Sequence, residues 1–357
     1  MSLASAETGP AIEVVRGALP EHVASALAAP DDAMIYGCPD FHAFLADAAG
    51  GRFLAFVARR AGAVKGALCA FEKTVAGAGT VFNSLPWYGS HGGCIGDGLD
   101  DAVRTALLRA VRDHVCTTQP LSATVICTPE EFAYAETYRR VLEPRAEDQR
   151  IGQFTQLPDA GNGFEQALEG VLRQKTRNLV RKARRQGFVE VVSDSPEAWH
   201  ALHAIHVRNM AAIGGTAKPW SHFEALQRHI PSRARRLSLA MSGEDVAAAL
   251  LVLAHRRTVE YLVPVIDVAY RSRQPLSFLI WQAMAWAAQA GHTRWNWGGT
   301  WGAQDSLHHF KAGWGAADRP YRYFTLADDA GVAWIRAHRD ALLEIFPFYF
   351  VYPFGAL

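Results

Sequence analysis

The chain has 357 residues, of which 50% are hydrophobic and 20% charged, and its formal net charge is +1. This length predicts two domains. The small net charge excludes a protein that coats nucleic acid through a basic surface all round, although a local basic patch remains compatible with it. The five cysteines are scattered and show no C-x-x-C spacing. This pattern predicts reduced thiols in a cytoplasmic protein, without a disulfide framework or a zinc site.

No targeting or membrane-spanning segment is expected. Residues 1–11 contain Glu7 and lack an apolar core, so they do not resemble a signal peptide. The longest apolar stretches fall well short of the roughly 20 residues that cross a bilayer. The aromatic segment 345–354 contains no basic residue that would hold it at a lipid surface. We therefore expect it to pack against the body of the protein, with contact to lipid as the alternative.

The N-terminal half is predicted to form a helix, a three-strand meander and then helix, strand, helix and strand. A segment rich in Gly, Asp and Asn at 158–163 follows and predicts a domain boundary. The expected elements are a helix at 41–49, strands at 53–57, 65–71 and 80–85, a helix at 100–114, a strand at 123–127, a helix at 130–141 and a strand at 150–157.

The C-terminal half is predicted to have a similar order of elements. Its expected elements are a strand at 188–192, helices at 197–212 and 221–229 (the second capped by Ser221), strands at 237–241, 246–254 and 259–265, an apolar helix at 276–290, a strand at 293–297, a helix at 306–314 and a strand at 321–326. The repeated order predicts an α/β protein with mixed sheets and two similar domains, at 11–158 and 164–330. A C-terminal helix and the aromatic tail, at 331–357, complete the chain.

Two neighbouring motifs stand out near the end of the second domain. Residues 296–300 read NWGGT, and residues 310–315 read FKAGWG. Lys311 is the one Lys or Arg between Arg294 and Arg319, and aromatic residues flank it on both sides. A single lysine in an aromatic, water-poor pocket suits the stabilisation of negative charge. The alternative is a surface lysine whose stem lies along Trp314.

A meander followed by helix, strand, helix and strand resembles the GNAT acyltransferase fold. The central helix of that fold normally follows a loop of pattern Arg/Gln-x-x-Gly-x-Gly/Ala, whose amides bind the pyrophosphate of coenzyme A. Here the loop at 271–276 reads RSRQPL, so Arg271 fits, but larger residues replace the two small ones and Pro275 removes an amide donor. The first-half loop at 93–98 reads GCIGDG and has no arginine. Neither loop resembles a complete coenzyme A site, and Arg271 is the one expected contact to such a cofactor.

Two GNAT-like halves without pyrophosphate loops resemble the Fem-type aminoacyl transferases, which add amino acids from charged tRNA to peptidoglycan precursors. The NWGGT and FKAGWG motifs look like the glycine turn and Phe-Lys signature of that family. Residues 173–187 (RQKTRNLVRKARRQG) are similar to its arginine-rich helix, and residues 93–97 to its first-domain turn ending in a functional aspartate, with Cys94 in place of proline. The resemblance covers roughly residues 30–326. The long coiled-coil arm of the staphylococcal proteins is missing, because 163–187 leaves room for one helix.

The resemblance implies transfer of an aminoacyl or acyl group to an amine of a cell-wall precursor or another phosphate-containing acceptor. Aminoacyl-tRNA is the expected donor, and an acyl-coenzyme A-dependent N-acetyltransferase is the second hypothesis. A catalytically inert protein that binds an anionic ligand is the third. No tightly bound cofactor and no metal are expected, because the histidines lack ligand spacing.

The resemblance also assigns roles to individual residues. Lys311 would stabilise the oxyanion, and Asp97 would position the acceptor amine, with capping of the helix that begins near 99–101 as the alternative for Asp97. Arg177 and Arg181 would bind phosphate of the acceptor or the tRNA backbone, unless acids from elsewhere in the chain neutralise them. The remaining candidate substrate contacts are Trp297, Gly298, Gly299, Phe310 and Tyr261, and a place in the core is the alternative for Trp297.

Overall fold

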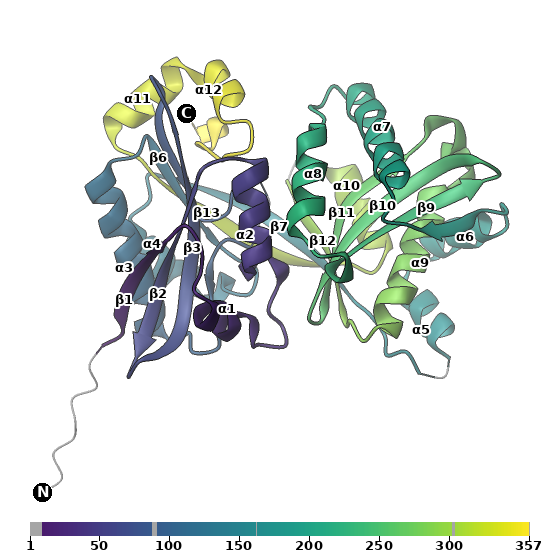
Figure 1. Ribbon diagram of the computed structural model, residues 1–357, viewed down its shortest axis with the longest axis horizontal. Coiled ribbons are helices and arrows are strands. Elements are labelled where there is room, and N and C mark those ends of the chain that lie inside the picture. The colour runs from purple at the N-terminus through teal and green to yellow at the C-terminus, as the bar shows by residue number, and fades with distance from the viewer. Residues whose placement is uncertain (1–8, 88–90, 162, 302–303, 357) are drawn as a thin grey trace, which may run out of the picture. The chain divides into compact units, whose positions relative to one another are not determined.

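The computed structural model describes residues 9–87, 91–161, 163–301 and 304–356, which divide into two compact units. Unit 1 contains the chain up to Arg150 together with residues 320–357, and unit 2 contains residues 151–319. Each unit consists of a twisted sheet with helices on its faces (Figure 1). The expected absence of a signal peptide concerns residues 1–11, most of which lie outside the described ranges.

The first repeat begins in unit 1, where the strand order of the sheet is β1-β2-β3-β4-β6 with β13 next to β6. A short strand, β5, pairs with β3 outside this order. The repeat comprises β1 (Ala11–Arg16), α1 (Glu21–Ala28), α2 (Pro39–Ala48), β2 (Arg52–Arg60), β3 (Ala63–Val75), β4 (Gly79–Asn83), β5 (Cys94–Ile95), α3 (Asp101–Thr118), β6 (Ser122–Cys127), α4 (Ala135–Leu142) and β7 (Ala146–Gln156).

The second repeat follows after two short helices, α5 (Phe164–Val171) and α6 (Gln174–Arg184). In unit 2 the strand order is β7-β12-β11-β10-β9-β8. The second repeat comprises β8 (Val189–Val192), α7 (Pro196–Ala212), α8 (Trp220–His229), β9 (Arg235–Ser242), β10 (Asp245–His255), β11 (Thr258–Ile266), α9 (Pro275–Gln289), β12 (Arg294–Thr300), α10 (Asp305–Gly313) and β13 (Ala317–Leu326).

The final strand of each repeat crosses from one unit to the other. β7 starts in unit 1, but its residues 151–156 belong to unit 2 and pair antiparallel with β12. β13 starts in unit 2, but its residues 322–326 pair antiparallel with β6 in unit 1. The expected division into 11–158 and 164–330 therefore differs from the observed units, because a final strand belongs to the sheet with which it forms hydrogen bonds.

Each unit contains a short parallel strand pair. In unit 1, β4 and β6 pair over three residues, from Val81 opposite Ser122 to Asn83 opposite Thr124. In unit 2, β11 and β12 pair over three residues, which end with Glu260 opposite Asn296. In both units the paired register therefore ends before β6 or β12 does. The match between the two pairs supports the predicted duplication.

The observed elements differ from the expected ones at several places. Strand β1 and helix α1 were not predicted, and the segment between Gly163 and Gly187 forms two helices, not one. Ser221 is not a helix cap, because α8 begins at Trp220 after Pro219 and has no side-chain cap. The region after β13 also forms two helices, α11 (Asp329–Ala337) and α12 (Arg339–Ile345), where one was expected.

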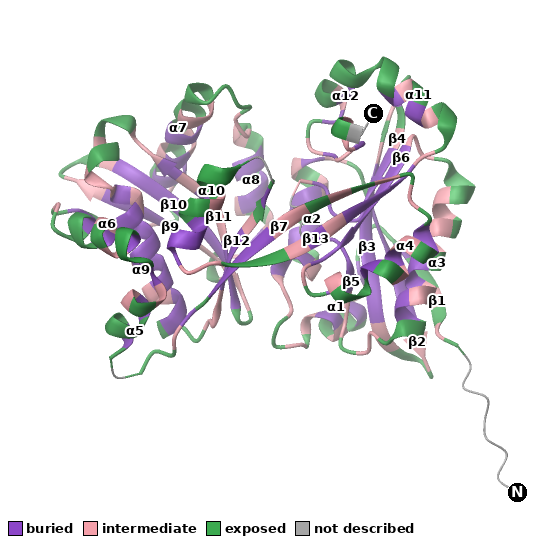
Figure 2. Ribbon diagram, turned by 180° about the vertical axis from the view of Figure 1, so that it is seen from behind, coloured by how far each residue is buried: buried purple, intermediate pink, exposed green. Residues whose placement is uncertain are grey.

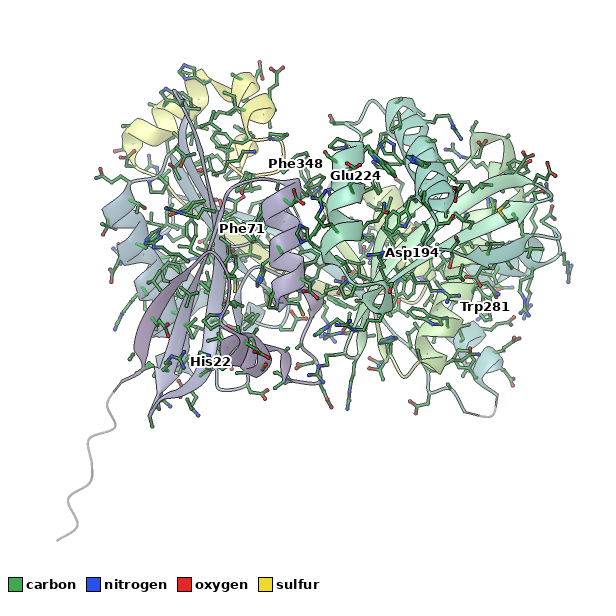
Figure 3. The ribbon with its side chains drawn as sticks, viewed as in Figure 1. His22, Phe71, Asp194, Glu224, Trp281 and Phe348 are labelled. Atoms are coloured by element: carbon green, nitrogen blue, oxygen red, sulfur yellow. The ribbon has the colours of Figure 1, made fainter. Side chains whose placement is uncertain are left out.

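Each unit has its own hydrophobic core between its sheet and its helices, as the buried strands in Figure 2 show. In unit 1, apolar side chains of α3 and α4 pack against β2, β3, β4 and β6. In unit 2 the core centres on α9, whose buried Trp281 is labelled in Figure 3. This explains why α9 is apolar along most of its length: nearly every side of it meets other apolar atoms.

The aromatic tail packs within unit 1. Phe348 stacks on Trp87 with ring centroids 3.7 Å apart, and the Tyr349 hydroxyl donates to the Gly50 carbonyl. The Phe350 amide donates to the side chain of Asn83, whose own amide donates back to the Phe350 carbonyl at 2.8 Å. Among the described residues, no helix is long and apolar enough to cross a membrane.

The two glycines of the FKAGWG motif lie where the α5–α6 segment packs closely against the end of α10. A Cβ on Gly313 would lie 2.5 Å from Thr176 Oγ1, and one on Gly315 would lie 2.6 Å from the Val171 carbonyl oxygen. The Arg173 amide also donates to the Gly313 carbonyl. Gly315 in addition has a φ of +77°, which side chains rarely adopt. The motif therefore needs glycine at these positions in order to pack.

We expect Gly315→Ala to lower the free energy of unfolding by about 3 kcal/mol, because strain from positive φ adds to overpacking against Val171. Gly243→Ala is the matched control, since Gly243 also has a positive φ (+64°) but has no atom within 4 Å of the added Cβ. It should cost about 1 kcal/mol. Denaturant unfolding of both variants measures the difference, and equal losses would contradict the packing explanation.

Candidate active site

Lys311 on α10 is buried, with 3% of its surface exposed, and its ammonium group meets three oxygen atoms. It donates to Thr300 Oγ1 at 2.8 Å, to the Gly299 carbonyl at 3.0 Å and to the Gly298 carbonyl at 3.3 Å. The alternative of a surface lysine is therefore wrong. The three acceptors use all three N–H donors of the ammonium, and the longest bond, to Gly298, is the one most easily given up to a ligand.

The glycine turn that faces Lys311 is a β-bulge. The register between β12 and β7 shifts between Asn296 and Gly299, so that Trp297 and Gly298 together oppose one residue of β7. Gly298 has a φ of +72°, and no atom lies within 4 Å of where its Cβ would be. Open space therefore borders the turn at Gly298, on the residue whose carbonyl makes the weakest bond to Lys311.

Burial lowers the pKa of the Lys311 ammonium from 10.5 to about 8. The cause is loss of hydration, which disfavours the charged form. At neutral pH the side chain is still largely protonated, so it can donate hydrogen bonds to a developing negative charge. In a water-poor site such a preorganised donor is worth more than it would be in water.

A buried carboxylate lies where β11 and β12 cease to pair. Glu260 is 3% exposed, and its Oε2 accepts a hydrogen bond from the Asn296 amide at 2.6 Å. Asn296 Oδ1 in turn accepts from the Gly298 amide at 2.9 Å. Hydrogen bonds thus connect Glu260 to the turn that holds Lys311. Local patterns do not point to Glu260, because its importance arises from pairing with Asn296, 36 positions away. The available signal was a charged residue inside a largely apolar strand.

The aromatic candidates divide between core and surface. Trp297 and Trp314 are buried in the unit 2 core, with ring centroids 6.0 Å apart. Tyr261 packs on the same core, 4.9 Å from the Trp297 ring, and Phe310 is partly exposed beside Trp297. Trp301 is 59% exposed. For Trp297 the structure supports the core interpretation, whereas the candidate Phe310 is exposed, as is the neighbouring Trp301.

The loop before α9 uses its polar groups internally. Gln274 adopts the left-handed conformation, donates from its side chain to the Arg271 carbonyl and accepts from Ser277 Oγ. Arg273 turns away from the helix end to the Gln186 carbonyl. Arg271 itself is exposed. Because Pro275 is the first helical residue, the first turn offers one amide fewer than a glycine-rich pyrophosphate loop.

The basic helix α6 faces acids from α5. Arg181 forms an ion pair with Glu169 at 2.5 Å, and Arg184 lies 3.5 Å from Glu165. Arg177 donates to the carbonyls of Glu169 and Leu172. The alternative of acids supplied from elsewhere therefore holds for Arg181 and Arg184. The segment 173–185 has seven basic residues against these two acids, so an excess of positive charge remains on this surface.

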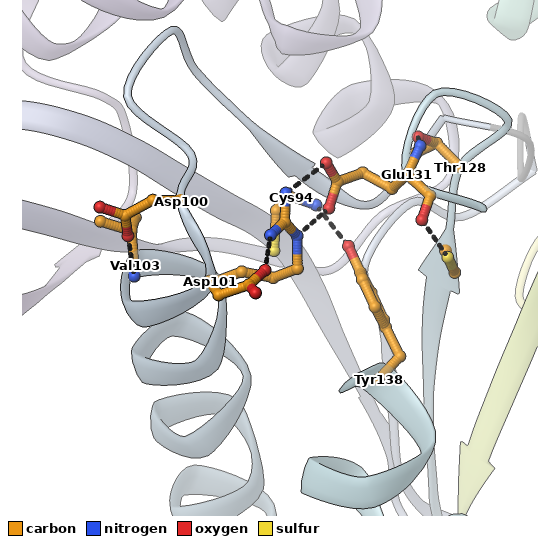
Figure 4. Close-up of polar contacts among 9 residues, drawn as sticks. Cys94, Asp100, Asp101, Val103, Thr128, Glu131 and Tyr138 are labelled. Atoms are coloured by element: carbon orange, nitrogen blue, oxygen red, sulfur yellow. Dashed lines mark hydrogen bonds and ion pairs between the residues drawn. The ribbon is translucent and has the colours of Figure 1, made fainter. Parts of the chain in front are cut away.

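Asp97 belongs to unit 1, where it is exposed at a pocket of about 330 Å³. It does not cap α3, because Asp100 is the cap and accepts from the Val103 amide. Figure 4 shows polar contacts around Glu131, which lines this pocket, and Arg104 donates to both carboxylate oxygens of Glu131. The pocket wall also includes His91, which stacks on Tyr36 with centroids 4.9 Å apart. Helix capping, the structural alternative for Asp97, is therefore not its role.

The residue of unit 1 that corresponds to Glu260 is Asn83, since each closes the three-residue parallel pairing. The side-chain amide of Asn83 forms hydrogen bonds with the backbone of Phe350 in the tail. Unit 1 therefore has neither the buried acid nor the lysine at this place. Within the described ranges, no group of three or more His, Cys, Asp and Glu side chains is arranged to hold a metal ion.

Lys311→Met tests the burial of the charge. Below pH 8 the lysine is protonated in both states, and burial of the charge reduces stability. Between about pH 8 and 10.5 the unfolded chain binds more protons, so the free energy of unfolding rises with pH. The free energy of unfolding of the wild type, minus that of Lys311→Met, should therefore increase by about 3 kcal/mol between pH 7 and pH 10.5. Urea unfolding at both pH values measures it, and a difference independent of pH would show that Lys311 is solvated.

Comparison with known proteins supports the predicted fold. The model of the acetyltransferase (GNAT) domain matches residues 171–323. Among solved structures, FemX is similar with a TM-score of 0.67 at 14% identity, over 85% of this chain and 95% of that chain. The C-terminal domain of a putative lysylphosphatidylglycerol synthetase from Agrobacterium fabrum is similar with a TM-score of 0.51 at 12% identity, over 90% and 96% of the two chains.

A tandem GNAT protein from the clavulanic acid biosynthesis pathway is similar with a TM-score of 0.51 at 14% identity, over 88% of this chain and 98% of that chain. A search of the curated proteins found no match. The structural likenesses extend over both repeats, and the domain match covers most of the second. The second repeat therefore carries a match to the GNAT acetyltransferase domain, and the chain has the fold of two GNAT-like halves.

Proposed function

We propose that this protein is an acyltransferase that moves an aminoacyl group from aminoacyl-tRNA to the amine of a phosphate-bearing acceptor, such as a cell-wall precursor. The observation that carries the proposal is the buried Lys311 of α10, which donates to the glycine bulge of β12 just after β11 and β12 cease to pair. Such a site presents a cation to a developing oxyanion. Similarity of fold to FemX and to the synthetase domain supports aminoacyl transfer in particular.

The transfer is attack of a neutral amine on the ester carbonyl of the donor. As the carbon–nitrogen bond forms, negative charge develops on the carbonyl oxygen, and Lys311 donates to it by releasing the Gly298 carbonyl. The amine proton leaves to a base, and the tetrahedral intermediate then expels the ribose oxygen of tRNA, which takes up a proton to become a hydroxyl. Glu260 is the base that we propose in unit 2, since its carboxylate is buried and hydrogen-bonded to the turn.

The donor is inferred from the loop before α9. Gln274 folds its side chain over the carbonyl of Arg271, and Pro275 supplies no amide. These features disfavour the pyrophosphate of coenzyme A and leave a donor that is held elsewhere. The segment 173–185 has more basic residues than acids that pair with them, and this excess of positive charge supports phosphate binding there, either from the acceptor or from the tRNA backbone.

Acyl-coenzyme A is the second candidate donor. The domain match at 171–323 is to an acetyltransferase model, and GNAT domains commonly use acyl-coenzyme A. The first turn of α9 has no side-chain cap, and Arg271 is exposed beside it, so an anion would find both amides and a guanidinium. On this reading Glu260 would keep its role toward the amine.

The decisive experiment supplies the purified protein with labelled aminoacyl-tRNA or labelled acetyl-coenzyme A, each with an extract of cell-wall precursors. We expect label to transfer from the tRNA, and Lys311→Met should lower kcat by about 10²-fold, the typical effect of one oxyanion donor. Lys73→Met, which removes a half-buried lysine of unit 1 that donates to the Ala49 carbonyl, is the matched control. Transfer from coenzyme A alone would replace the donor in the proposal, and transfer from neither would favour a binding protein.

Glu260→Gln tests the proposed base. The variant retains the size of the side chain and an oxygen for Asn296, but cannot accept a proton, so kcat should fall by about 10²-fold or more. The acidic limb of the pH–rate profile should also change, since only protonation of the acceptor amine would then remain to cause it. Glu190→Gln, at a half-buried acid on β8 that pairs with Arg236, is the control and should leave the profile unchanged. A wild-type profile in Glu260→Gln would assign the proton to another group.

A further inference from the structure

A continuous chain of hydrogen bonds runs from Lys311 to the surface of unit 2. Lys311 Nζ donates to Thr300 Oγ1 at 2.8 Å, and Thr300 Oγ1 donates to Gln153 Oε1 at 2.8 Å. Gln153 Nε2 donates to Asp318 Oδ1 at 3.2 Å, and both Asp318 oxygens lie 2.9 Å from His308 Nε2. Gln153 is fully buried at 0% exposure, whereas the Asp318 side chain is 47% exposed.

The chemistry at the exposed end determines the direction of every bond in this chain. An ionised Asp318 carboxylate can only accept, so Gln153 must turn its NH₂ group toward it. The Gln153 carbonyl oxygen then faces Thr300, whose hydroxyl must donate to it. The lone pairs of that hydroxyl remain for Lys311, whose ammonium can only donate. If the amide were flipped, two acceptors would meet at Asp318 and the Thr300 proton would be displaced toward the ammonium.

The β-bulge brings the members of this chain to one side of the sheet. Thr300 pairs with Ile151, and Asn296 pairs with Phe154, so the extra residue lies between them. Without it, the alternation of side chains would place Thr300 on the face opposite Trp297. With it, both project toward α10, where Lys311 donates to Thr300 Oγ1 at 2.8 Å and the Phe310 ring lies 6.0 Å from the Trp297 ring. The one residue of β7 that faces the bulge is Gln153.

We infer that Gln153 is a positioning residue for Lys311, and that Asp318 orients Gln153. The inference rests on the proposed function in one respect, since it assumes that the orientation of the Lys311 ammonium matters for catalysis. Gln153 lies on β7, the last strand of the first repeat, while Lys311 and Thr300 belong to the second. A residue from the first half of the chain therefore orients, through Thr300, the lysine in the second half.

NMR titration of the lysine side chains tests the positioning without any assay of activity. The chain has six lysines, so protein labelled with ¹³C at lysine Cε gives a simple spectrum in which Lys311 is assigned by its loss in Lys311→Met. In wild type the Lys311 signal should titrate near its pKa of about 8. In Gln153→Leu the Thr300 hydroxyl is no longer held as an acceptor, so the midpoint should fall by half a pH unit or more.

Gln156→Leu is the matched control, since Gln156 is an exposed glutamine on the same strand and should leave the Lys311 midpoint unchanged. If Gln153→Leu does not fold, Asp318→Asn at the exposed end of the chain should shift the midpoint in the same direction by a smaller amount. In the transfer assay Gln153→Leu should lower kcat about tenfold with KM unchanged. An unchanged Lys311 midpoint in a folded Gln153→Leu or Asp318→Asn variant would overturn the inference. Absence of transfer by wild type from either donor would instead refute the proposed function and leave the titration result standing.

Discussion

The Lys311 ammonium is the charge around which the C-terminal motif of this protein is built. A buried ammonium without hydrogen-bond acceptors is costly, and here two main-chain carbonyls and one hydroxyl supply them. Two successive carbonyls can turn toward one side chain because the strand bulges at Gly298, whose positive φ suits glycine. The glycines of the NWGGT motif thus follow from the burial of the lysine.

Close packing explains the glycines that follow Lys311. Gly313 and Gly315 let the α5–α6 segment approach the end of α10 closely. The two repeats also differ in a consistent way at matching places. Glu260 in unit 2 corresponds to Asn83 in unit 1, and Asn83 binds the main chain of the aromatic tail. The second half has the features of a reaction site, and the first half has an internal anchor at the equivalent position.

Much of the fold could be predicted from local patterns. The two meanders and the apolar helix at 276–290 were confirmed within a few residues, because alternating or periodic apolar residues report directly on burial. β1 and α1 were missed, since β1 is an edge strand with mostly exposed residues and carries little alternation. The single helix expected between 163 and 187 is two, and the acids on the first of them neutralise part of the basic face predicted on the second.

The sequence by itself determined the chemistry that is available: one lysine among aromatic residues, glycines where backbone must come close, and a helix start without a pyrophosphate loop. These are local properties, which composition and spacing express directly. The tertiary structure decided how that chemistry is arranged. It buried Lys311, paired Glu260 with Asn296, and passed β7 from the first repeat to the sheet of unit 2, so that Gln153 reaches Thr300. Contacts between residues more than 100 positions apart depend on strand pairing and bulge register, and neither can be deduced from the residues of one segment alone.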